Sequence, residues 1–129
     1  MTVDWKTVIG NSATIVETHK RDGSWVSTPV TMIEYGAGAV FFTDSRTGKV
    51  KRIRNFADVR VAPATWRGVS TGKLAMATAR ILAGEENQKA LQAMRHKHKF
   101  MFGLLLRVRY QLNGATPLMV ELSDLRELS

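Results

Sequence analysis

The sequence predicts an α+β protein that is mostly β-structure, with about six antiparallel strands forming a small barrel. One observation is a series of short runs rich in β-branched residues, separated by turn signals. The other is a single long helical pattern late in the chain. Because no linker or internal repeat divides the 129 residues, we expect a single domain over residues 1–129.

The first half of the chain predicts three strands. Residues 12–19 are rich in β-branched side chains and are followed by an Asp-Gly turn signal at 22–23. The return strand is expected from Trp25 to Ile33, with an edge or a bulge at Pro29 because proline cannot donate to a β-ladder. After a glycine-rich turn, Ala39 to Thr43 is the third expected strand.

A short helix is expected at residues 48–55, followed by strands at Asp58–Ala64, Lys73–Leu82 and Pro117–Leu125. Between the last two strands, Gly84-Glu85-Glu86 opens a long helix with acids in its first turn. Residues three or four apart in that segment, which would share one face of a helix, are Leu91, Met94, His98, Met101 and Leu105. Residues 104–113 fit a strand and a continuing helix equally, and the N-terminal segment 4–10 shows no helical start.

Composition excludes some functions and leaves others open. The chain has no cysteine, so disulfides, thiolate metal sites and cysteine nucleophiles are excluded. It shows no secretion signal and no apolar run long enough to span a bilayer, so we expect a cytoplasmic protein with no membrane partner. The net charge of +8 suits a nucleic acid or a polyanionic small ligand.

The segment Thr43–Asn55 carries the clearest functional signal. A strand end gives way to a turn of small residues and then to a helix, and no acid follows Asp44. Gly48 permits close approach of backbone N–H groups, and a helix N-terminus is itself a site for anions. Its cations are Arg46, Lys49, Lys51, Arg52 and Arg54. We therefore predict an anion-binding site, with Lys49, Lys51, Arg52 and Arg54 exposed and Val50 and Ile53 facing inward.

The histidines give weaker signals. His19 is expected to cap a strand end or to face solvent. His96 and His98 lie two residues apart on the expected helix, so they do not share a face and predict no metal site. No catalytic acid or base is identifiable from the sequence.

Over residues 12–125 the sequence resembles the pyridoxamine 5′-phosphate oxidase-like split β-barrel family, in particular its branch that binds the deazaflavin coenzyme F420. The matching segments are Arg21-Asp22-Gly23, Val26–Val30, Phe42-Thr43, Thr47–Asn55, Asp58–Pro63 and Ala79–Leu82. The string from Gly48 to Asn55 is the most specific of them. The resemblance implies a split β-barrel with a short basic helix, a C-terminal helical segment, and one cofactor per subunit between the barrels of a homodimer.

The resemblance also implies roles for individual residues. Ser27, Thr28, Pro29 and Val30 would lie along the deazaflavin ring. Thr43, Thr47 and Lys49 would surround the cofactor phosphate, with backbone N–H groups of Gly48 and Val50. Arg52, and secondarily Lys51 or Arg54, would meet the carboxylates of the polyglutamate tail.

We therefore expect an F420-dependent oxidoreductase that transfers a hydride to or from a small organic molecule. The alternatives are a barrel of the same type that binds flavin mononucleotide (FMN) or haem, and a non-catalytic F420 carrier. A basic nucleic-acid-binding barrel is the alternative from another class, and it is disfavoured because the aromatic residues are not interleaved with cations along the strands.

Overall fold

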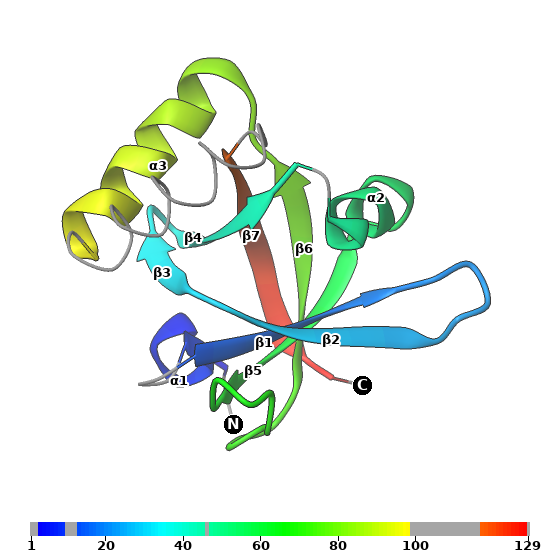
Figure 1. Ribbon diagram of the computed structural model, residues 1–129. Helices are drawn as coiled ribbons and strands as arrows, with labels where there is room; N and C mark the ends of the chain where they lie inside the picture. Colours follow the sequence, from blue (N-terminus) through cyan, green and yellow to red (C-terminus); the bar gives the residue numbers. More distant parts are fainter. Residues whose placement is uncertain (1–2, 10–12, 46, 99–116, 129) are drawn as a thin grey trace.

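Seven antiparallel strands form one curled sheet in the computed structural model, which describes residues 3–9, 13–45, 47–98 and 117–128 (Figure 1). The strands are β1 Ala13–His19, β2 Trp25–Val30, β3 Met32–Tyr35, β4 Gly38–Asp44, β5 Asp58–Ala64, β6 Ala75–Ile81 and β7 Pro117–Glu127. The helices are α1 Trp5–Ile9, α2 Gly48–Asn55 and α3 Gly84–Lys97. The prediction of a mostly β, split-barrel protein is confirmed.

The order of strands shows how the sheet curls. The order is β2-β1-β5-β6-β7-β4-β3, so its two edge strands are consecutive in the chain and meet at Thr31. β2 pairs with β1, whereas β3 pairs with β4. The single strand predicted from Trp25 to Ile33 is therefore wrong, because the chain changes partners at Thr31. The prediction that Pro29 lies on an edge strand is confirmed.

The other predicted strands differ from the observed ones by at most two residues at either end, and β5 has the predicted bounds. The prediction that His98 belongs to the long helix is wrong, since α3 ends at Lys97 and His98 is its C-cap. Met101, Leu105 and the contested residues 104–113 lie outside the described residues.

A short helix, α1, precedes the sheet and was not predicted. The Asp4 carboxylate accepts a hydrogen bond from the Thr7 backbone N–H at 2.8 Å, which caps the helix and lowers the pKa of Asp4. The apolar side chain of Val8 is buried in the core of the barrel. Asp4 is the sequence signal that identifies this helix start.

Two apolar clusters lie on opposite faces of the curled sheet. The inner cluster fills the barrel and includes Val16 of β1, Phe41 of β4 and Ile53 of α2. The outer cluster joins Leu91 and Met94 of α3 to β3, β4 and β7. Accordingly, α3 covers one outer face of the sheet, while α2 contacts β1 and β6 (Figure 1).

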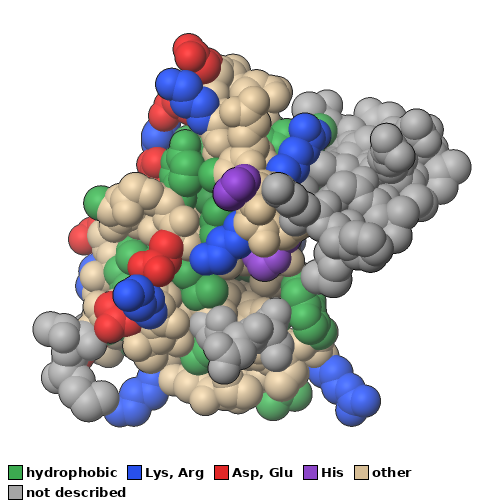
Figure 2. All heavy atoms as spheres, turned by 90° about the vertical axis from the view of Figure 1, so that its left-hand side faces the viewer, with side chains coloured by type: hydrophobic (Ala, Val, Ile, Leu, Met, Phe, Trp, Pro, Cys, Tyr) green, Lys and Arg blue, Asp and Glu red, His purple; other side chains and the backbone are tan. Residues whose placement is uncertain are grey.

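The charges of α3 follow its dipole. Acids occupy the first turn, and Arg95, His96 and Lys97 occupy the last turn, where a positive charge is favoured. Figure 2 shows Lys, Arg and His side chains on the face that holds α1 and α3, together with Asp and Glu side chains. Within the described ranges, no helix is both long and apolar enough to cross a membrane.

Candidate functional site

The turn between β4 and α2 brings two threonine hydroxyls together at the start of the helix. Thr43 is buried, and its Oγ1 lies 3.2 Å from the Thr47 Oγ1. The Thr47 N–H and hydroxyl both donate to the Asp44 carbonyl, each at 3.1 Å. Thr47 is the N-cap, but its side chain makes no capping hydrogen bond to the helix. The first turn of α2 is therefore not capped by its own N-cap side chain, which suits an anion.

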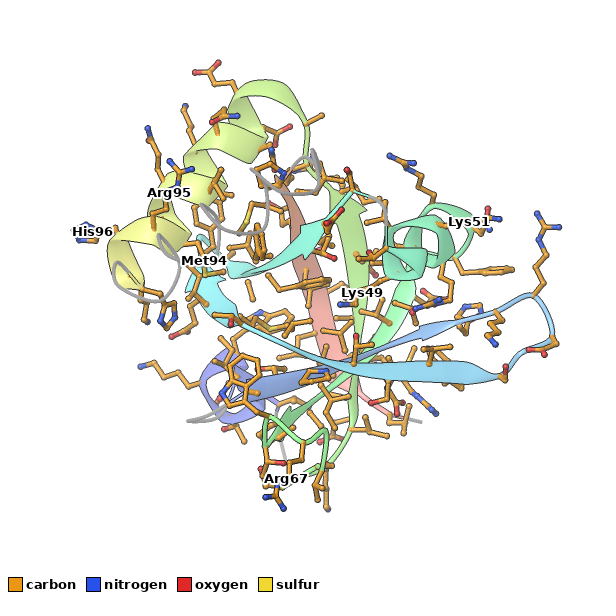
Figure 3. The ribbon with its side chains drawn as sticks, in the orientation of Figure 1. Lys49, Lys51, Arg67, Met94, Arg95 and His96 are labelled. Carbon is orange, nitrogen blue, oxygen red and sulfur yellow. The ribbon has the colours of Figure 1, made fainter. Side chains whose placement is uncertain are left out.

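Lys49 does not lie where the sequence predicts it. Its side chain is 9% exposed rather than on the surface, and its Nζ lies 5.8 Å from the centre of the Phe41 ring. The reason is helical spacing: Lys49 and the buried Ile53 are four residues apart and share the face of α2 that packs on the sheet. Figure 3 shows Lys49 on the sheet side of α2 and Lys51 on its outer side. Val50 and Ile53 face inward, as predicted.

Arg52 folds back over the start of its own helix. Its Nε donates to the Thr18 Oγ1 at 2.7 Å. A Cβ built at Gly48 would lie 2.7 Å from the Arg52 Nη1, so the missing side chain of Gly48 leaves room for the guanidinium. A half-buried cation therefore lies beside the helix N-terminus. Lys51 and Arg54 are exposed, as predicted, and Arg46 lies outside the described residues. The prediction that Arg52 is exposed is wrong, because its bond to Thr18 draws the side chain against β1.

The predicted residues of β2 form a second group. Ser27 is exposed, Pro29 is half-buried and Val30 is buried. The Thr28 Oγ1 is buried without a hydrogen-bond partner, which is uncommon for a polar atom. Arg52 is bonded to Thr18 of β1, whose cross-strand partner on β2 is Val26. The start of α2 thus brings together Thr43, Thr47, Gly48, Lys49 and Arg52. The β2 group lies on the strand that pairs with β1, which α2 contacts.

A cleft of about 470 Å³ lies between α2 and the β1–β2 hairpin, and we refer to it as the basic cleft. Its lining consists of His19, Lys20, Arg21, Asp22, Lys51, Arg52, Asn55 and Phe56. Four of these are cations and one is an acid. The Asp22 carboxylate accepts hydrogen bonds from the Ser24 N–H and hydroxyl, at 2.9 and 2.7 Å, and these bonds lower the pKa of Asp22. The basic cleft therefore has a net positive charge.

Sequence reasoning missed the hairpin side of this cleft. Lys20 and Arg21 directly precede the Asp-Gly turn, but α2 lies about thirty residues further along the chain, and only the fold brings the two together. His19 ends β1, and its ring lies 4.2 Å from the Phe56 ring and 4.8 Å from the Trp25 ring. The sequence indicates the hairpin side of the cleft only through the two cations that precede the turn signal.

The described residues contain no group of three or more His, Cys, Asp or Glu side chains that could hold a metal ion. His96 is exposed on the last turn of α3, and His98 follows the helix. What the described site can do chemically is bind anions.

The curled, mostly β sheet of this chain is shared by several solved structures. The haem storage protein HutZ from Vibrio cholerae superposes with a TM-score of 0.64 at 11% identity, covering 90% of this chain and 85% of that one. A protein from Listeria innocua, assigned as a pyridoxamine 5′-phosphate oxidase, gives 0.58 at 11% identity, over 92% and 89%. An FAD-binding protein from Mesorhizobium loti gives 0.51 at 14% identity, over 100% and 98%.

No protein-family model and no curated protein sequence matches this chain. At identities of 11–14% the structural likeness shows the fold alone. The protein therefore has the split β-barrel architecture found in flavin-binding, haem-storing and oxidase-like proteins.

Proposed function

We propose that this protein binds coenzyme F420 as a homodimer and uses it to transfer a hydride to or from a small organic molecule. The observation that supports this most directly is the connection between the basic cleft and the start of α2. Arg52 belongs to both: it lines the cleft and lies against Gly48. A ligand with a phosphate followed by several carboxylates matches this continuous positive surface.

The donors at the start of α2 fit the phosphate. The hydroxyls of Thr43 and Thr47, the N–H groups of Gly48 and Val50, and the Lys49 ammonium would surround it. Lys49 is buried on the sheet side of α2, so its ammonium would meet a phosphate in a setting that water screens less than the surface. The tail carboxylates would meet Arg52 and Lys51, and the cleft adds Lys20 and Arg21 from the hairpin.

The β2 segment Ser27–Val30 would lie along the deazaflavin ring. The unpaired Thr28 hydroxyl supports a polar contact of this strand with a ligand, since a buried hydroxyl without a partner costs free energy. When bound, the deazaflavin supplies two-electron hydride chemistry at its C5. The residues of this chain hold and orient it and exclude water, and none is assigned as an acid or base.

FMN is the second candidate, because an FAD-binding protein shares the fold. FMN carries one phosphate and no polyglutamate tail. Its phosphate would occupy the start of α2, but FMN has no carboxylates to meet Lys20, Arg21 and Lys51 in the basic cleft. The basic cleft therefore favours F420.

The test compares two double variants of equal charge. Arg21→Gln with Lys51→Gln removes two cations of the basic cleft, whereas Lys73→Gln with Lys89→Gln removes two exposed cations elsewhere. Fluorescence titration should show about tenfold weaker F420 binding for the first pair and little change for the second. Equal affinities for the two pairs would contradict the tail assignment.

Turnover separates an oxidoreductase from a carrier. Oxidation of reduced F420 by a panel of quinones, nitroaromatics, tetrapyrroles and unsaturated carbonyls, accelerated by the protein, would establish the enzymatic role. Tight F420 binding with no acceleration for any class would assign a carrier instead.

A further inference from the structure

A second cleft, of about 310 Å³, lies at the bend where β2 becomes β3, and we call it the bend cleft. It is walled by α1, the start of β1, the bend itself and the end of α3. The lining residues that carry the argument are Lys6, Val30, Thr31, Met32, Lys97 and His98. Neither the sequence pattern nor the proposed cofactor site accounts for this cleft.

The lining of the bend cleft combines an apolar floor with a cationic rim. Val30 and Met32 belong to the inner apolar cluster, Ile9 packs against it, and these three residues form the floor of the cleft. Lys6 and Lys97 are exposed on the rim, and His98 is half-buried beside them. Glu34 is the single acid in the lining. On this face Lys, Arg and His side chains gather near the end of α3 (Figure 2).

The bend cleft is continuous with the proposed cofactor strand. Val30 ends β2 and belongs to the segment expected along the deazaflavin ring, and it also lines this cleft. A molecule held on Val30 and Thr31 would therefore lie at the end of the strand that is proposed to carry the cofactor ring. The basic cleft lies elsewhere, between the hairpin and α2.

We propose that the bend cleft is the substrate site and takes an apolar molecule that carries one anionic group, such as a carboxylate or sulfonate. This assignment to the substrate rests on the proposed function. The apolar part would be held by burial against the floor, and the anionic group by Lys6 and Lys97 at the rim. The volume suits a small molecule rather than a peptide or an oligonucleotide.

The test uses 8-anilinonaphthalene-1-sulfonate as an apolar anion and N-phenyl-1-naphthylamine as its uncharged counterpart. The native protein should bind the sulfonate saturably and more tightly than the amine. Lys6→Gln with Lys97→Gln should weaken sulfonate binding about fivefold and leave amine binding unchanged.

Two controls of the same charge change locate the effect. Lys73→Gln with Lys89→Gln, and Arg21→Gln with Lys51→Gln from the basic cleft, should both bind the sulfonate as the native protein does. Equal weakening in all three pairs, or no weakening in the first, would overturn the proposal.

F420 titration of the Lys6→Gln with Lys97→Gln variant separates this proposal from the proposed function. Its F420 affinity should equal that of the native protein. If the variant binds F420 normally and binds the sulfonate as tightly as the native protein does, the proposal for the bend cleft is wrong and the proposed function stands. If the native protein does not bind F420, the proposed cofactor is wrong. The sulfonate result would still support a site for apolar anions in the bend cleft.

Discussion

Lys49 lies at the start of α2, where a phosphate-binding cation is expected, but its side chain is buried against the barrel. Its ammonium lies 5.8 Å from the centre of the Phe41 ring. A substitution here therefore affects both folding and binding. The two effects can be separated by keeping the length of the side chain.

We predict that Lys49→Met retains the fold and loses at least tenfold in F420 affinity. Methionine fills the space of the lysine stem but supplies no charge, and a charge-assisted contact to a phosphate contributes about 1.5–3 kcal/mol. Thermal unfolding and F420 titration of the same sample measure the two effects. Lys49→Ala should lose stability as well, because it leaves a cavity. Native F420 affinity in the methionine variant would exclude Lys49 from the phosphate site.

A substitution at Gly48 also distinguishes an effect on folding from an effect on F420 binding. Gly48→Ala should change stability little, because the new Cβ would meet only the far end of the flexible Arg52 side chain. The new Cβ would displace the Arg52 guanidinium from the helix start, since the two would be only 2.7 Å apart. F420 binding should therefore weaken while the melting temperature changes little. A variant that binds F420 like the native protein would show that this position of Arg52 is unimportant.

At the scale of elements, a buried polar side chain joins α3 to β7. Asn87 is buried, its Oδ1 accepts the Met119 N–H at 2.8 Å, and its Nδ2 donates to the Pro117 carbonyl at 3.2 Å. Both partners lie on β7. The side chain therefore satisfies backbone groups that would otherwise be buried and unpaired.

We predict that Asn87→Ala lowers the free energy of unfolding by about 1–3 kcal/mol, because it leaves a buried N–H without a partner. Gln92→Ala, at an exposed position of the same helix, should change it by less than about 0.5 kcal/mol. Chemical denaturation of both variants measures the difference. Similar values for the two would show that Asn87 does not hold α3 to β7.

Elements with local signals could be predicted from the sequence, and those set by distant pairing could not. The Asp-Gly turn, the strand Asp58–Ala64 and the acidic start of α3 carry their own signals and were found where predicted. The break at Thr31 could not be predicted, because it depends on β2 and β3 pairing with different strands. Similarly, the cations of α2 could be predicted, but their cleft with Lys20 and Arg21 depends on the fold.

At the scale of the whole molecule, cations of the described residues lie in distinct places on the barrel. Two of these places are clefts with different chemistry. The basic cleft offers four cations to a polyanion, whereas the bend cleft offers an apolar floor with a cationic rim. This arrangement is consistent with one site for an anionic cofactor and another for its substrate.

Salt should affect the two clefts differently. We predict that F420 affinity falls steeply as salt is raised from low to physiological concentrations, because several exposed cations are screened together. Binding of the apolar sulfonate at the bend cleft should fall less, since salt screens its contact with two lysines but does not weaken the burial of its apolar surface. Titrations at several salt concentrations measure both slopes. Equal slopes would contradict this division of the charge.

The central claim is that the anion site at α2 and the basic cleft together select a deazaflavin with an anionic tail. Fluorescence titration of the purified protein with F420, and separately with FMN, tests it most directly. The account predicts saturable binding of F420 and much weaker binding of FMN. Tighter binding of FMN, or binding of neither cofactor, would contradict it.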